Sequence, residues 1–122
     1  MPVYLDCNAT TPLEPEVSRV VRTYMETEYG NSGSRTHGHG TRARQAVEVA
    51  RRSVAALVDA QVDEVTFTSG ATESNNLALL GLAEAAHAAG RRHVLVTSIE
   101  HKAVLAPCEE LARRGFEEEQ VP

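Results

Sequence analysis

A run of small and hydroxyl-bearing residues, Thr66-Phe-Thr-Ser-Gly-Ala-Thr-Glu-Ser74, is the strongest candidate for chemistry in this sequence. It follows an apolar stretch and precedes a helical pattern, and ligands of parallel α/β sheets bind where a strand ends. A helix start has backbone N–H groups without intrahelical partners, and Gly70 and Ala71 are small enough to let a phosphate approach them. Ser69 and Thr72 add hydroxyl donors. The run indicates either a phosphate site or a plain helix start with Ser69 as its N-cap.

A second segment, Ser98-Ile-Glu-His-Lys-Ala-Val104, follows the next apolar stretch and is expected at the same edge of the sheet. His101 could stack on an aromatic cofactor and transfer protons, because imidazole gains and loses a proton near neutral pH. The alternative is a histidine in a surface loop. If His101 faces a ligand ring, its extended neighbour Lys102, the only lysine, is expected to point the other way.

The loop at residues 30–40 and the two cysteines are weaker candidates. His37 and His39 are too few ligands for a metal site, so the loop is better explained as the mouth of a site or a subunit interface. Cys7 and Cys108 lie too far apart in the sequence for a metal-binding spacing. We expect two reduced thiols, with Cys108 in the core and the reactivity of Cys7 left open.

The elements that must position these residues follow from the periodicity of apolar side chains. Predicted helices cover 14–29, 38–58, 72–89 and 103–114, and predicted strands cover 64–68, 93–97 and a segment from Phe116 onward. Alternating strands and helices predict an α/β fold with a parallel sheet. So few strands leave the sheet incomplete, with at least one open edge.

Composition excludes several functional classes. The chain has 122 residues, of which 42% are hydrophobic and 24% charged, so a folded domain is expected rather than a disordered segment. The basic residues are spread over several segments and the net charge is -5, which argues against direct nucleic-acid binding. Neither a membrane span nor a signal peptide is recognisable, and a cytoplasmic location is expected.

Taken together, four segments resemble the cysteine desulfurases of the NifS/IscS type, within the wider class V aminotransferase family. They occur in the same order as in those enzymes and extend over essentially the whole chain. The segments are Tyr4-Leu-Asp-Cys-Asn-Ala-Thr-Thr-Pro12, the loop with Gly30, Asn31, Ser34, His37 and Gly40, Thr68-Ser-Gly-Ala-Thr-Glu-Ser-Asn75, and Glu100-His-Lys-Ala-Val104.

This resemblance implies the N-terminal part of a fold-type-I transferase that depends on pyridoxal 5′-phosphate and works as a homodimer. Residues 1–13 would form an arm associated with the small domain, and residues 14–122 the first part of the large cofactor-binding domain. Gly70, Ala71 and Thr72 match the positions that hold the cofactor phosphate. His101 matches the histidine that stacks on the pyridine ring and helps to transfer protons.

The resemblance also implies a reaction, in which L-cysteine becomes L-alanine and its sulfur passes through an enzyme persulfide to an acceptor protein. The lysine that anchors the cofactor and the cysteine that accepts sulfur would lie beyond residue 122, so the chain alone is expected to be inactive. The acceptor could serve iron–sulfur assembly, RNA thiolation or DNA phosphorothioation. Alternatives are another class V enzyme, such as a selenocysteine lyase or an aminotransferase, or a non-catalytic α/β module that binds phosphate or a partner protein.

Overall fold

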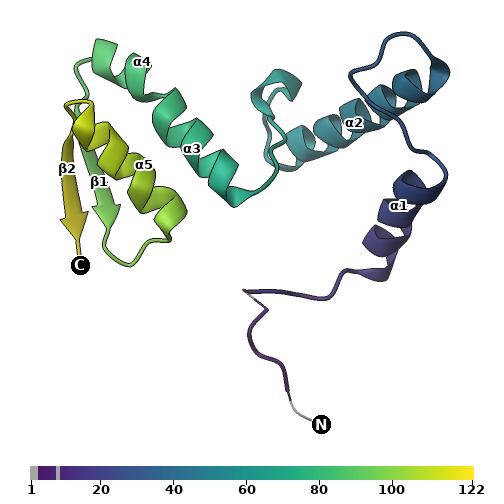
Figure 1. Ribbon diagram of the computed structural model, residues 1–122, viewed down its shortest axis with the longest axis horizontal. Helices are drawn as coiled ribbons and strands as arrows, with labels where there is room; N and C mark the ends of the chain where they lie inside the picture. The colour runs from purple at the N-terminus through teal and green to yellow at the C-terminus, as the bar shows by residue number, and fades with distance from the viewer. Residues whose placement is uncertain (1–2, 8) are drawn as a thin grey trace. The chain divides into compact units, whose positions relative to one another are not determined.

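The computed structural model describes residues 3–7 and 9–122 and divides the chain into two compact units, residues 1–65 and residues 66–122 (Figure 1). The N-terminal unit consists of helix α1 (Pro15–Glu26), helix α2 (Gly38–Leu57) and a short 3₁₀-helix, η1 (Val62–Glu64). The C-terminal unit contains helix α3 (Ala71–Gly81), helix α4 (Ala83–Ala88), strand β1 (His93–Thr97), helix α5 (Lys102–Arg113) and strand β2 (Glu117–Val121). No helix among the described residues is both long and apolar enough to cross a membrane.

Helices α1 and α2 form where the apolar periodicity predicts them, although α1 ends three residues early. Pro15 occupies a first-turn position, where its missing N–H costs no hydrogen bond. At the C-terminal end of α1, the Thr27 hydroxyl donates to the Thr23 carbonyl oxygen at 3.0 Å. The Glu28 N–H donates to the same oxygen at 2.9 Å. These competing bonds stop the helix before Tyr29.

The loop that precedes α2 is tied to that helix by Arg44. Its guanidinium donates to the carbonyl oxygens of Ser32, at 3.1 Å, and Ser34, at 2.7 Å. Gly40 is buried under the same loop, and a Cβ atom added there would lie 2.6 Å from the Ser34 oxygen. A side chain at position 40 therefore cannot coexist with this loop conformation.

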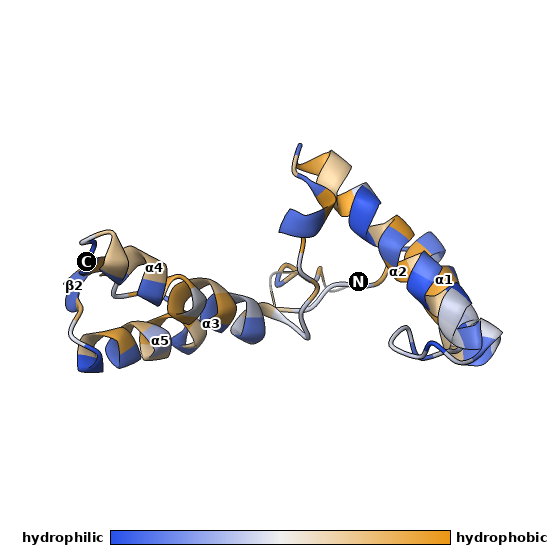
Figure 2. Ribbon diagram, turned by 90° about the horizontal axis from the view of Figure 1, so that it is seen from above, coloured by the Kyte–Doolittle hydropathy of each residue, from blue (hydrophilic) through white to orange (hydrophobic). Residues whose placement is uncertain are grey.

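An apolar surface between α1 and α2 is only partly covered within the N-terminal unit. Val20, Tyr24, Ala43 and Val47 are among the residues that border an open hollow of about 490 Å³. Val20 and Tyr24 remain 44% and 45% exposed. Figure 2 shows the apolar segments of both helices interrupted by polar ones, as expected for amphipathic helices.

In the C-terminal unit, α5 contacts α3 and both strands of a parallel two-stranded sheet. The register pairs Val94 with Glu118 and Val96 with Gln120. The parallel sheet and the strand after Phe116 are confirmed. The buried residues of this unit are Ala83, Val96, Ala103, Pro107, Cys108 and Leu111.

Cys108 is 1% exposed, which confirms its predicted place in the core. Burial, followed by the nearby negative charge of Glu118, raises the pKa of its thiol. The thiol therefore stays protonated and behaves as a small apolar group. Cys7, in contrast, is exposed.

Two predicted elements are wrong. The segment 64–68 is not a strand: η1 occupies 62–64, and residues 65–68 belong to no helix or strand, since the sheet of the described part of the chain contains β1 and β2. An apolar, β-branched segment becomes a strand only where a neighbouring strand offers hydrogen bonds. The single helix predicted for 72–89 is instead two, α3 and α4, which separate at Leu82 directly after Gly81, a poor helix former.

Two glycines in the first turn of α2 give a matched test of the loop packing. Gly40→Ala should destabilise the chain by about 1–3 kcal/mol, because the new methyl group overlaps the Ser34 backbone. In Gly38→Ala the new methyl group meets only the flexible end of Arg42, at 3.5 Å, so its stability should change little. Urea unfolding followed by circular dichroism measures both variants, and equal stabilities would contradict this loop structure.

Candidate functional site

The turn that enters α3 is the first part of the candidate site. Gly70 is the N-cap, and the first hydrogen bond of the helix runs from the Ser74 N–H to the Gly70 carbonyl at 3.1 Å. The N–H groups of residues 71–73 precede that bond and carry the positive end of the helix dipole. A Cβ atom added at Gly70 would meet no atom within 4 Å, so this side of the turn is open to an approaching group.

Ser69 differs from its predicted roles, because Glu73 binds both of its donors. One oxygen of the Glu73 carboxylate accepts both the backbone N–H and the hydroxyl of Ser69, each at 2.6 Å. Ser69 is not the N-cap, and its hydroxyl is committed to Glu73 rather than to a phosphate. These hydrogen bonds, the hydroxyl first and then the amide, lower the pKa of Glu73.

A second pair of side chains closes the same turn. The hydroxyl oxygens of Thr68 and Ser74 lie 2.7 Å apart, and each lies 3.2 Å from the Gly70 carbonyl oxygen. Each hydroxyl carries one proton, so one can donate to the other while the second donates to the carbonyl. The turn is thus held by side chains on both sides of Gly70. Sequence analysis missed both pairs, although a glutamate in the first turn of a helix is a known capping signal.

His101 is the N-cap of α5. Its Nδ1 atom accepts the Ala103 N–H at 3.0 Å, and its backbone is extended. A nitrogen that accepts a hydrogen bond carries no proton, so the proton of the neutral ring lies on Nε2. This hydrogen bond fixes the orientation of the imidazole and leaves its second nitrogen for another partner.

Thr72 and His101 border one open hollow of about 440 Å³ between α3 and α5. Asn76, whose side-chain amide donates to the Thr72 carbonyl at 2.8 Å, lies on the same rim. Lys102 borders the hollow as well. Lys102 is not the extended neighbour of His101 that we expected, because it is the first helical residue of α5.

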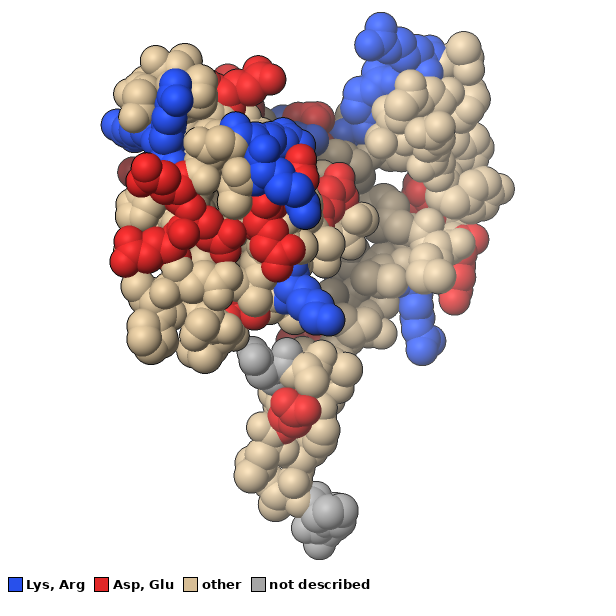
Figure 3. All heavy atoms as spheres, turned by 60° about the vertical axis from the view of Figure 1, so that its left-hand side comes forward, with Lys and Arg blue, Asp and Glu red and all other residues tan. Residues whose placement is uncertain are grey.

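The acidic side chain that borders this hollow, Glu110, is paired. Glu110 is on its rim and binds Arg114 and Arg113, each at 2.9 Å. Hydrogen bonds from Arg114 and then Arg113 lower the pKa of its carboxyl group. On the face drawn in Figure 3, acidic and basic side chains lie close to one another rather than in a continuous basic stripe. This distribution gives no sign of a nucleic-acid surface on that face.

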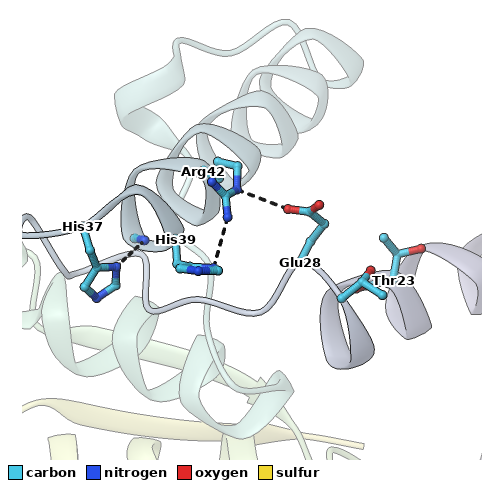
Figure 4. A network of polar contacts seen from close by, with 7 residues as sticks. Thr23, Glu28, His37, His39 and Arg42 are labelled. Atoms are coloured by element: carbon cyan, nitrogen blue, oxygen red, sulfur yellow. Dashed lines mark hydrogen bonds and ion pairs between the residues drawn. The ribbon is translucent and has the colours of Figure 1, made fainter.

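The histidines of the 30–40 loop serve structural roles. Nδ1 of His37 accepts the Gly40 N–H at 3.2 Å, and Nδ1 of His39 lies 3.1 Å from an Arg42 nitrogen (Figure 4). Arg42 also binds Glu28 at 3.3 Å. Among residues 3–7 and 9–122, no group of three or more histidine, cysteine or acidic side chains could hold a metal ion.

The described residues fit pyridoxal 5′-phosphate at two points. The open side of Gly70, with the first-turn N–H groups and the Thr72 hydroxyl, suits a phosphate. The planar imidazole of His101 on the same hollow suits an aromatic ring. When bound, this cofactor would supply the electron-accepting ring of the chemistry, and these residues would hold its phosphate and face its ring.

Comparison with known proteins shows the family of the chain. Residues 3–121 match the family described as aminotransferase class V. The chain is 47% identical over 119 residues to the cysteine desulfurase IscS of Shewanella loihica, which covers 96% of this chain and 29% of that relative. The chain thus spans less than a third of the length of such curated relatives.

Solved structures give the same result. DndA from Streptomyces lividans is 53% identical, with a TM-score of 0.78, over 98% of this chain and 33% of the other. A NifS-like protein is 39% identical, with a TM-score of 0.84, over 100% of this chain and 33% of the other. SspA, solved in complex with cysteine, is 34% identical, with a TM-score of 0.82, over 97% and 33% of the two chains. The protein is therefore an α/β member of the class V aminotransferase family, matching the N-terminal third of its NifS-like and DndA relatives.

Proposed function

We propose that this chain supplies the phosphate-binding turn and the ring-stacking histidine of a cysteine desulfurase that depends on pyridoxal 5′-phosphate. The observation that carries the proposal is the position of Thr72 and His101 on one hollow. They lie 29 positions apart in the sequence. One suits the anionic end of the cofactor and the other its aromatic end. The similarity to cysteine desulfurases over 96% of the chain supports the choice of reaction.

The phosphate would be held mainly by backbone groups and by Thr72. Gly70 leaves room for its oxygens, and the N–H groups of Ala71 and Thr72 precede the first helical hydrogen bond. Hydrogen bonds to a charged group contribute about 1.5–3 kcal/mol each, more than neutral ones. Ser69 is excluded from this set because its hydroxyl donates to Glu73.

His101 would stack on the cofactor ring and transfer a proton at Nε2. Its Nδ1 is already engaged by Ala103, so Nε2 is the nitrogen left for the reaction. Fixing one nitrogen by a backbone hydrogen bond sets both the tautomer and the ring plane before the substrate arrives. Such preorganisation is how a protein makes proton transfer efficient.

The wider assignment extends to the longer protein. Its substrate would be L-cysteine, its products L-alanine and a persulfide on an enzyme cysteine, and its partners a sulfur-acceptor protein and a second copy of itself. We further propose that residues 1–13 form an arm associated with the small domain and that residues 14–122 begin the large domain of a cytoplasmic enzyme. Detection of alanine from L-cysteine by that protein, and of sulfide once a thiol reductant is added to cleave the persulfide, tests the reaction. Activity only toward selenocysteine, or only as an aminotransferase, would contradict it.

Phosphate recognition can be tested without covalent chemistry. Pyridoxine 5′-phosphate and pyridoxine differ only in the phosphate, and neither has an aldehyde that could react with Lys102. The chain should bind the phosphorylated compound more tightly, and Thr72→Ala should weaken that binding by about 10-fold or more. Thr72→Ser, which keeps the hydroxyl, is the control. Equal affinities for the two compounds in NMR titrations would contradict the phosphate site.

The two roles of His101 can be separated by substitution. His101→Ala should destabilise the chain by about 0.5–2 kcal/mol, because α5 loses its N-cap. His101→Asn should retain the stability, since asparagine is a good N-cap. In the longer enzyme, both variants should lose about 10²–10⁴-fold in turnover. Turnover restored by asparagine would show that His101 acts only as a cap.

Lys102 should not replace the anchoring lysine of the family, although it borders the hollow. We expect the 122-residue chain, mixed with pyridoxal 5′-phosphate and L-cysteine, to release no alanine above a protein-free control. Lys102→Ala should behave in the same way. Alanine formation by the chain that Lys102→Ala abolishes would assign the catalytic lysine to this position.

A further inference from the structure

We propose that Glu73 is a positioning residue for the cofactor phosphate, because its carboxylate holds both donors of Ser69 and so shapes the Ser69–Gly70 turn before any anion binds. This inference rests on the proposed function and deepens it. Glu73 itself would not contact the phosphate. Its role would be to keep the turn in the one conformation that presents the N–H groups of residues 71 and 72.

The geometry of the turn supports this role. Glu73 lies in the first turn of α3 but reaches back past the N-cap to Ser69, at 2.6 Å for both donors. An ordinary capping glutamate bonds the N-cap residue itself. Here the N-cap is Gly70, which has no side chain and makes no side-chain capping bond. We call the two hydrogen bonds from Ser69 to the Glu73 carboxylate the clamp. The clamp acts one residue before the N-cap and leaves the open side of Gly70 unobstructed.

The clamp also removes competing groups from the phosphate site. Without it, the Ser69 hydroxyl could bond the first-turn N–H groups in place of a phosphate, as serine does in ordinary N-caps. With it, the hydroxyl donates to a carboxylate. The Thr68–Ser74 pair satisfies the Gly70 carbonyl from the other side. Both donors of Ser69 and the carbonyl of Gly70 thus have partners within the turn, which leaves the first-turn N–H groups for an anion.

Glu73 has two opposite effects on phosphate binding. Its negative charge repels the phosphate, whereas its hydrogen bonds to Ser69 order the turn that binds it. Repulsion between exposed charges is screened by water and salt. The hydroxyl and then the amide of Ser69 stabilise the ionised Glu73 carboxylate and so lower its pKa; the charge is kept, but one carboxylate oxygen is engaged by both Ser69 donors. Ordering the turn, in contrast, carries a large entropic cost at Gly70, because glycine loses more backbone freedom on ordering than any other residue. We therefore expect ordering of the turn to outweigh repulsion, so that removing Glu73 weakens phosphate binding.

Two measurements on the 122-residue chain test this. Amide hydrogen exchange at Ser69 should be about five- to tenfold faster in Glu73→Ala, which loses the hydrogen bond to that amide. The preference for pyridoxine 5′-phosphate over pyridoxine should fall in the same variant by a similar factor. Glu73→Gln keeps an acceptor and should recover part of both effects. Glu84→Ala removes an exposed first-turn acid of α4 and should change neither.

The outcomes separate the inference from the proposed function. If Glu73→Ala retains the phosphate preference or binds the phosphate more tightly than the wild type, the positioning role is overturned while the phosphate site stands. The same holds if Ser69 is as unprotected in the wild type as in the variant. If the wild type itself shows no preference for the phosphate, the proposed function fails, and the positioning role fails with it.

Discussion

The packing of α5 against α3 is the contact on which the candidate site depends. The N-terminal end of each helix contributes to the site, through Thr72 of α3 and the N-cap residue His101 of α5. The two helices contact each other, and the buried residues Ala103 and Pro107 of α5 border the same hollow as Thr72. Burial of such surface is non-directional, but it fixes which helix ends lie side by side. Local hydrogen bonds then set the conformation of each end.

Those local bonds leave the start of α3 open and close the start of α5 with its own side chain. At α5, the His101 ring accepts the Ala103 N–H and so occupies the first turn. At α3, the N-cap is a glycine, and the nearby hydroxyl and carboxylate bond each other instead of the helix. The same chemical groups would give an ordinary capped helix in a different arrangement. The two helix starts differ in their acceptors: the His101 ring accepts an N–H group of its own helix, whereas the Glu73 carboxylate accepts the donors of Ser69.

Much of this arrangement could be predicted from sequence, because it is local. Helical periodicity located α2 and α5, and the alternation of elements gave the parallel pairing of β1 with β2. The predicted strand at 64–68 was wrong because a strand forms only beside another strand, and a pattern of β-branched residues does not show whether one is present. The expectation that Lys102 is extended was wrong for another reason: α5 begins one residue earlier than predicted, and such a shift of a helix start changes where a side chain points.

The central claim is that Thr72 and His101 bind the two ends of one cofactor. Intermolecular nuclear Overhauser effects from bound pyridoxine 5′-phosphate test it most directly, because they report both ends in one experiment. The account predicts contacts from the ring methyl group to the His101 imidazole protons, and from the methylene next to the phosphate to the Thr72 methyl group. Contacts to residues outside the hollow, or to only one of these two side chains, would contradict it.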